Sequence, residues 1–379
     1  MLEMPFVKQE AKMIKYCFSF LAFASIQLSC LSPTHACTDF RLTAIDGTLL
    51  VTRSMEFGQD LQSNIRSSPR GRQFSSASPN GKSGLSWKSK YGYLYLDGLG
   101  LDASFDGMNE QGLTFEFLYL PGETQYQDVP NGKETHALAY FMFGDWVLGN
   151  FKTIAEVKQA LNEIYVAPVK IPQFGSAILP GHVSIYDASG HGIVIEFYDN
   201  KINISENIGV MTNSPKYNWH VNNLRNYVNL SATNVTPVTE GGFTFSATGQ
   251  GSGAVGLPGD ASPPSRFVKT AFMAHNVFPA ENSVELLNLA EHIINNVDLP
   301  SGYVRSVDNG KTTSDTTQWV VFKNISQKTI YYRTYNDMTL RSIDMAKIDF
   351  SEGASPLKMP LVMPPYVMNV TDKFIKTKG

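Results

Sequence analysis

The chain has 379 residues, and its 31 Lys and Arg residues against 34 Asp and Glu residues give a formal net charge of −3 and a pI near 6.2. This balance lacks the basic excess of a nucleic-acid-binding protein. With 42% apolar residues and no internal repeat or coiled-coil pattern, the sequence predicts a soluble globular protein that is large enough to bury a full core.

The start of the chain has the layout of a secretory signal peptide. Lysines within residues 8–15 precede a mixed apolar run at 16–31, which is too short to span a bilayer. Thr34 and Ala36 then place small residues third and first before Cys37, as a signal peptidase requires. A buried first helix is the alternative interpretation.

Removal of residues 1–36 would leave residues 37–379 as a single exported domain, either periplasmic or secreted. Met13 is an alternative start, because it shortens the basic region to an ordinary length. No later stretch matches the apolar density of the leader, so we expect no membrane span in the mature chain.

Cysteine usage gives the first functional hypothesis. Cys17 and Cys30 fall inside the predicted leader, so the mature chain would begin with its one cysteine, Cys37, and could form no internal disulfide. An N-terminal cysteine carries a thiol and an α-amine on one residue, and that amine has a pKa of about 8. It can therefore serve as its own general base. Lipidation is the alternative, although the residues before Cys37 and Cys30 match a lipobox poorly.

Strand patterns dominate the first third of the mature chain. "CTDFRLTAIDGTLLVTRSMEF" has two alternating runs around Asp46-Gly47, which predicts a hairpin. Residues 93–122 predict further strands, with turns at Asp97-Gly98 and at 109–112. Residues 182–200 predict another hairpin.

Helical periodicity begins at residues 135–150 and continues behind the Thr153 cap, with Glu156 three residues on. Further helices are predicted at about 217–229, 265–279 and 283–296, before closing strands that include "TQWVVFKN" and "KTIYYRTYND". Alternating sheets and helices predict an α+β fold, a four-layer αββα sandwich of two antiparallel sheets covered by helices. The Gly- and Pro-rich segment 245–265 is expected to be an ordered loop over a site, with a flexible tip as the alternative.

Several other motifs are rejected. "GSGAVG" at 251–256 neither follows a strand nor opens a helix, so it predicts no dinucleotide site. The histidines form no HExxH motif, and no GxSxG elbow is present, so we predict neither a metal site, nor a cofactor, nor a serine hydrolase of that type.

Two charged residues accompany Cys37 on the predicted hairpin. The turn at Asp46-Gly47 brings the region of Arg53 back opposite Cys37, and Glu56 follows closely. An arginine beside a thiol favours the thiolate, and a carboxylate near an α-amine can orient it. A surface salt bridge at a strand end is the plainer interpretation of this pair.

Separated motifs in a consistent order indicate a family. The chain resembles the choloylglycine hydrolases, which group bile salt hydrolases with penicillin V acylases among the N-terminal nucleophile (Ntn) hydrolases. The resemblance covers nearly all of the mature chain. It rests on "CTDF", "VTRSMEFG", "DGMNEQGL" followed by "LYLPG", "GVMTNSPKYNWH" and "GLPGDASPPSRF".

The resemblance implies a role for each matching residue. Cys37 would be the nucleophile, with Arg53 as its charge partner, and Glu56 replaces the aspartate that usually orients the terminal amine. Asn213 would donate its side-chain amide to the oxyanion together with the backbone N–H of Tyr119, and Arg266 would complete the polar cluster. Tyrosine at position 119 is typical of penicillin V acylases rather than of many bile salt hydrolases.

The sequence therefore predicts an exported amidohydrolase that cleaves a non-peptide amide between an apolar acyl group and a small amine. Conjugated bile acids, penicillin V and N-acyl homoserine lactones remain open as substrates, and the resemblance implies a homotetramer. An exported or lipid-anchored acyl-binding protein without catalysis is the alternative from another class. Five aromatic residues are candidates for the acyl pocket: Phe57, Trp87, Phe141, Phe143 and Phe174.

Overall fold

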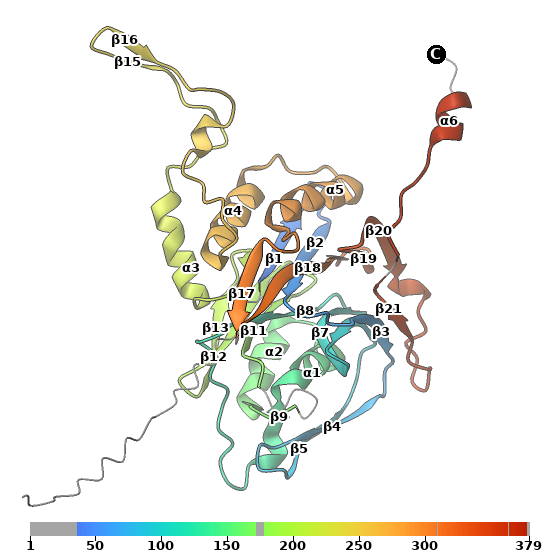
Figure 1. The fold of residues 1–379 in the computed structure, drawn as a ribbon. Coiled ribbons are helices and arrows are strands. Elements are labelled where there is room, and N and C mark those ends of the chain that lie inside the picture. The colour runs from blue at the N-terminus through green and yellow to red at the C-terminus, as the bar shows by residue number, and fades with distance from the viewer. Residues whose placement is uncertain (1–35, 172–177, 309, 363, 377–379) are drawn as a thin grey trace, which may run out of the picture. The chain divides into compact units, whose positions relative to one another are not determined.

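The computed structural model describes residues 36–376 except 172–177, 309 and 363. Within this part of the chain, two large antiparallel sheets stack face to face with helices outside them (Figure 1). The predicted αββα sandwich is thus confirmed. The described residues include no helix that is long and apolar enough to cross a membrane.

The first sheet carries Cys37 at the start of a strand. Its strand order is β14 (Val210–Met211), β1 (Cys37–Thr43), β2 (Leu49–Phe57), β18 (Lys311–Asn324), β19 (Thr329–Thr334) and β20 (Asp337–Asp344), and β17 (Val304–Asp308) also pairs with β18. β1 and β2 form the predicted hairpin. Gly47 occupies its turn with φ +85°, a conformation that glycine adopts without strain.

The second sheet faces the first across a shared core. Its strand order is β13 (Lys201–Glu206), β12 (Gly192–Tyr198), β11 (Gly181–Tyr186), β8 (Thr114–Tyr119), β7 (Leu101–Asn109), β6 (Tyr93–Gly98), β3 (Asn64–Ser68) and β21 (Lys358–Pro360). β11 and β12 form the second predicted hairpin. The turn predicted at Asp97-Gly98 instead lies at Leu99-Gly100, where both residues have positive φ.

Helices cover the outer faces of both sheets. They are α1 (Phe143–Asn150), α2 (Ile154–Ala160), α3 (Tyr217–Asn223), α4 (Pro263–Asn276) and α5 (Ser283–Ile294), whereas α6 (Thr371–Lys376) lies apart from the sheets (Figure 1). α4 packs on β1 and α5 on both β1 and β2, whereas α1 packs on β7 and β8 (Figure 1). The Thr153 hydroxyl accepts a hydrogen bond from Glu156 N at 3.2 Å, which confirms the predicted helix start.

Three short strand pairs complete the described sheets: β4 (Gln73–Ala77) with β5 (Ser83–Lys88), β9 (Ala137–Ala139) with β10 (Tyr165–Ala167), and β15 (Val238–Glu240) with β16 (Phe243–Phe245).

The helix predicted over 135–150 is wrong in its first half. Residues 137–139 pair in parallel with β10 instead, and α1 begins only at Phe143.

The segment 245–265 does not lie over the site as expected. The β15–β16 hairpin extends away from α3 and α4 (Figure 1), and residues 246–251 are exposed. The segment's last residues belong to the start of α4, and the next residue of that helix, Arg266, contacts Cys37.

Candidate active site

Cys37 lies at the buried junction of the two sheets. It is the first residue of β1, pairs with Met55 on β2, and exposes only 2% of its surface. Its Sγ lies 3.8 Å from Met55 Sδ and 3.5 Å from Arg53 Nη2. The hairpin therefore places Arg53 beside the thiol, as the sequence predicted.

Arg53 bridges from the first sheet to the second. Nη2 donates to the carbonyl of Phe117 at 2.6 Å, and Nη1 donates to the carbonyl of Phe105 at 3.3 Å. The guanidinium carbon also lies 5.0 Å from the ring centroid of Trp319, within the range of a cation–π interaction. These contacts fix a fully buried positive charge next to Cys37 Sγ.

The thiol is held in its neutral form at rest. Burial raises the pKa of Cys37 above its ordinary value, the charge of Arg53 opposes this rise, and the charge of Glu56 adds to it. Because burial is the largest of these effects, attack on a substrate requires a base that removes the thiol proton. The α-amine that removal of residues 1–36 would create at Cys37 lies on the same residue.

Asn213 lies two residues beyond the end of β14 and contacts the nitrogen of Cys37. Its Oδ1 accepts from Cys37 N at 2.7 Å and from Arg266 Nη2 at 2.7 Å, so the amide oxygen faces both donors. Its Nδ2 donates to the carbonyl of Tyr119 at 2.7 Å. An amide nitrogen has two hydrogens, which leaves a second one that can point at a substrate oxygen.

Tyr119 presents its backbone to the same site. It closes β8 and lies opposite Gly181 in the ladder, where neighbouring Leu120 N bonds the carbonyl of Pro180. Antiparallel alternation therefore turns the Tyr119 peptide groups away from β11 and toward Asn213. In a strand the N–H and C=O of one residue point the same way, so the Tyr119 N–H faces the site as well.

Arg266 reaches the site from the first turns of α4. Its Nη1 donates to the carbonyl of Cys37 and to Thr38 Oγ1, both at 2.6 Å, and its Nε donates to the carbonyl of Ala261 at 3.0 Å. Arg266 is 1% exposed. It therefore fixes both the main chain of Cys37 and the amide orientation of Asn213.

Glu56 lies on the helix-facing side of β2, and its carboxyl is half satisfied. Oε1 accepts from Thr317 Oγ1 at 2.8 Å, whereas Oε2 has no hydrogen-bond partner among the described residues. The Glu56 backbone N–H donates to the carbonyl of Ala36 at 2.9 Å. Burial raises the pKa of Glu56 to about 7, against the opposing charge of Arg266.

An apolar cavity opens beside Cys37 Sγ. Its volume is about 30 Å³, which is room for about two water molecules. Of the five aromatic candidates, Phe57 lines it; Trp87 instead stacks on Phe74, Phe141 and Phe143 pack in the core around α1, and Phe174 lies outside the described residues. The sequence interpretation missed six apolar lining residues: Met55, Leu61, Leu99, Phe105, Phe117 and Leu179.

A second group of buried charges lies behind Arg53, and sequence reasoning missed it. Asp106 Oδ2 lies 3.5 Å from Arg53 Nη1, and Lys323 Nζ bridges Asp106 Oδ1 at 2.5 Å and Glu116 Oε1 at 2.8 Å. All four side chains are fully buried between the sheets. The sequence signal that was available is that Asp106, Glu116 and Lys323 are charged residues inside buried stretches of strands.

The sequence and the fold both match known amide hydrolases. Residues 37–357 match the family of linear amide C–N hydrolases described as the choloylglycine hydrolase family. The chain belongs to the choloylglycine hydrolase family. It is therefore an amidase that acts on the C–N bond of linear amides, and the family match begins at Cys37.

Individual relatives match this chain over most of their length. It is 35% identical over 321 residues to the bile salt hydrolase/transferase of Clostridium perfringens, covering 82% of this chain and 93% of that protein. A solved structure of conjugated bile acid hydrolase from the same organism superposes with a TM-score of 0.77 at 32% identity, covering 88% of this chain and 100% of the other. Penicillin V acylase from Agrobacterium tumefaciens gives a TM-score of 0.70 at 27% identity, covering 86% and 91%.

Proposed function

We propose that this choloylglycine hydrolase is exported, loses residues 1–36, and uses Cys37 as an N-terminal nucleophile against amides of apolar acyl groups. The observation that carries the proposal is that Cys37 is held at both reactive atoms. Arg53 Nη2 lies 3.5 Å from its Sγ, and Asn213 Oδ1 lies 2.7 Å from its nitrogen.

In the proposed reaction the α-amine of Cys37 takes the thiol proton as Sγ attacks the carboxamide carbon. Asn213 Nδ2–H and the Tyr119 N–H donate to the tetrahedral oxyanion. The C–N bond then breaks, and the α-ammonium returns the proton to the departing amine. A water molecule, deprotonated by the same α-amine, attacks the thioester carbon and releases the acid and the Cys37 thiol.

Three features support this assignment of roles. Asn213 Oδ1 accepts from the Cys37 nitrogen, which would hold the α-amine in place beside the thiol. Arg53 supplies a buried positive charge for the thiolate that forms during attack. The unpartnered Oε2 of Glu56 can pair with the ammonium once Ala36 is gone, which is the role that the family's aspartate would have.

We call the apolar cavity beside Cys37 Sγ the acyl cavity. Its lining residues are mainly aliphatic and aromatic, which favours a substrate with an apolar acyl group. Names of relatives supply the substrate candidates, namely conjugated bile acids and penicillin V, and N-acyl homoserine lactones are a third candidate. The test is hydrolysis of this panel by protein that begins at Cys37, by Cys37→Ser, and by a chain extended before Cys37. Activity that survives either change would contradict the proposal.

We also propose a homotetramer. The exposed apolar side chains of the β15–β16 hairpin, Val238, Phe243 and Phe245, support an assembly contact there. Light scattering of the wild type should give four times the monomer mass, and the double variant Phe243→Ser/Phe245→Ser should reduce it. A monomeric wild type would contradict the assembly.

A further inference from the structure

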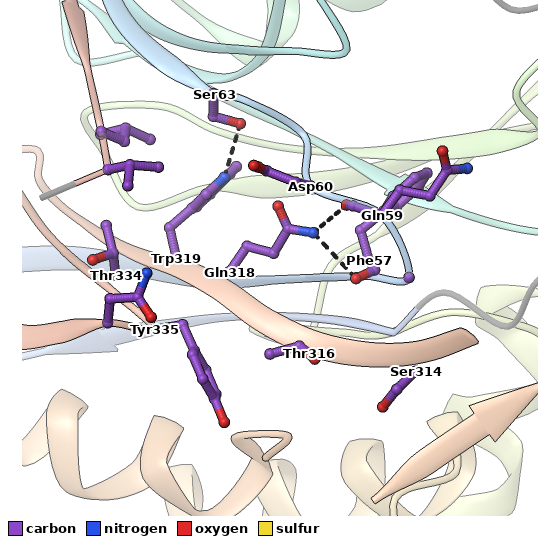
Figure 2. A pocket seen from close by; sticks show the side chains of 14 residues that line it. Phe57, Gln59, Asp60, Ser63, Ser314, Thr316, Gln318, Trp319, Thr334 and Tyr335 are labelled. Carbon is purple, nitrogen blue, oxygen red and sulfur yellow. Dashed lines mark hydrogen bonds between the residues drawn. The ribbon is translucent and has the colours of Figure 1, made fainter. Parts of the chain in front are cut away.

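A second cavity lies next to the acyl cavity, and the segment that begins at Phe57 forms the wall between them. Its volume is about 270 Å³, and its lining is rich in hydroxyl and amide groups from β18 and from the β19–β20 turn (Figure 2). Phe57 lines both cavities. The smaller cavity contains Cys37, and the larger one does not.

One irregular segment, Phe57–Leu61, separates the two cavities. Phe57 and Leu61 face the acyl cavity, whereas Phe57 through Asp60 line the larger one. Beyond Phe57 the segment belongs to no helix or strand until β3 begins at Asn64. Its ends are held by the ladder pairing of Phe57 with Thr316 and by the bond from Leu99 N to the carbonyl of Leu61 at 2.7 Å, whereas the residues between them depend on other contacts.

Gln318 supplies such contacts through its side chain. Its Oε1 accepts from Leu61 N at 2.9 Å, and its Nε2 donates to the carbonyl of Phe57 at 3.1 Å and to the carbonyl of Gln59. Figure 2 shows the Gln318 amide directed at this segment, with both donated bonds drawn. A single side chain thus holds three peptide groups of the wall.

The local backbone explains why Gln318 can do this. β18 pairs with β2 through Thr317 opposite Glu56 and Trp319 opposite Met55, so Gln318 is the extra residue of a β-bulge. A bulge re-aims the side chain of its extra residue away from the regular alternation. The neighbouring Thr317 contacts Glu56, and Trp319 contacts Arg53, both in the candidate active site. The Gln318 side chain instead binds the Phe57–Leu61 segment.

The volumes of the two cavities indicate that the Phe57–Leu61 segment controls the space available for an acyl group. Sites for small molecules usually measure about 300–1,000 Å³, and the acyl cavity at about 30 Å³ falls far below this. An acyl group can therefore enter only when lining residues move. The larger cavity provides space on the far side of Phe57 into which the segment can retreat.

We propose that Gln318 determines acyl specificity as a positioning residue: its amide holds the Phe57–Leu61 segment against the acyl cavity, so that slender acyl groups are favoured over bulky ones. The inference rests on the proposed hydrolase function. Loss of the three bonds lets the segment move toward the larger cavity and admits a wider acyl group at the same catalytic residues.

Two substitutions separate the bonds from the rest of the fold. Gln318→Leu removes all three bonds at similar side-chain volume. Gln318→Glu keeps the acceptor for Leu61 N but sets a carboxylate against the carbonyls of Phe57 and Gln59. The matched control is Thr316→Val, which alters another β18 residue that lines the same cavity.

The experiment measures amide hydrogen exchange of residues 57–61, together with kcat/KM for a slender acyl amide (penicillin V) and a bulky one (a conjugated bile acid). We expect exchange at least tenfold faster in both Gln318 variants. The ratio of bulky to slender kcat/KM should rise at least fivefold, and Thr316→Val should match the wild type in both readouts. Thermal unfolding of each variant shows that the fold is retained, and Gln318→Glu stands in if Gln318→Leu does not fold.

Unchanged exchange in a folded Gln318 variant would overturn the proposal. It would also be overturned if exchange accelerated while both kcat/KM values fell by the same factor, because Gln318 would then only support the fold. If the wild type cleaved neither amide, the substrates of the proposed function would be wrong, whereas the exchange measurement would still report whether Gln318 holds the wall.

Discussion

The side-chain oxygen of Asn213 lies 2.7 Å from the backbone nitrogen of Cys37, although 176 residues separate them in the chain. Arg266 donates to the same oxygen at 2.7 Å, so the amide cannot flip without facing Arg266 with its own donors. The donor end of Asn213 is thereby directed toward Tyr119 and the expected oxyanion position.

Replacing Asn213 by Ala should therefore reduce kcat more than it changes KM. Removal of one oxyanion donor typically costs about 10²–10³ in kcat, and the variant also loses the acceptor that orients the Cys37 nitrogen. Steady-state kinetics on the cleaved amide checks this. Asn336→Ala, a change in the β19–β20 turn, is the control, and equal kcat values for wild type and Asn213→Ala would contradict the oxyanion role.

His220 should act on the reaction through Asn213. Its Nε2 donates to the carbonyl of Asn213 at 2.8 Å, and its ring stacks on Phe267, next to Arg266. Burial lowers the pKa of His220 to about 4, so the ring stays neutral at physiological pH. His220→Leu leaves a buried carbonyl unpaired, at a cost of about 1–3 kcal/mol.

If that cost appears in the transition state, kcat should fall roughly 5- to 150-fold. The pH–rate profile above pH 5 should keep its shape, since no titrating group is lost there, and His220→Gln should restore part of the rate. A shifted profile would instead indicate that His220 titrates during the reaction.

The buried carboxyl of Glu56 should make the stability of the fold depend on pH. In a chain that retains Ala36, burial raises the pKa of Glu56 to about 7, above its unfolded value of about 4.3. The folded state then binds the proton more tightly, so its stabilisation is complete below about pH 4.3 and is lost as the pH rises to about 7.

Glu56→Gln should remove this loss, and at pH 8 the variant should unfold with a free energy higher by about 4 kcal/mol or less. Urea unfolding from pH 4 to pH 8 measures the difference, with exposed Glu240→Gln as the control. Parallel stability curves for wild type and Glu56→Gln would show that Glu56 is already ionised in the fold.

Lys323 should matter for stability because it neutralises buried carboxylates. Its Nζ lies 2.5 Å from Asp106 and 2.8 Å from Glu116, and all three side chains are fully buried. Lys323→Met leaves Glu116 without a cation and Asp106 with Arg53 alone at 3.5 Å, and breaking a buried pair in this way costs about 3–5 kcal/mol.

Adding Asp106→Asn and Glu116→Gln to Lys323→Met should recover most of that loss, because amides need no counter-charge. Denaturant unfolding of the single and triple variants is the measurement. A single variant that is as stable as the wild type would mean that the cluster binds protons in place of the lysine.

Local sequence patterns predicted the elements that depend on neighbouring residues. The Asp46-Gly47 turn pairs Cys37 with Met55 and brings Arg53 to the thiol, and the Thr153 cap begins α2. Motif resemblance supplied Asn213 and Arg266, which no local pattern could connect to Cys37. The structure brings both to it.

Features that depend on distant partners could not be predicted. Residues 137–139 form a strand because β10 pairs with them, although their apolar spacing also suits a helix. Lys323 and Asp106 lie 217 residues apart, so their ion pair has no sequence signal. The bulge at Gln318 depends on the register between β18 and β2, which single-strand patterns do not fix.

The N-terminal nucleophile is tested first by the intact mass and N-terminal sequence of the exported protein before and after treatment with a thiol-reactive label. We expect a chain that begins at unmodified Cys37 and gains one label, with hydrolysis lost in step with labelling. A lipidated or blocked Cys37, or residues retained before it in an active enzyme, would contradict the claim that Cys37 provides its own general base.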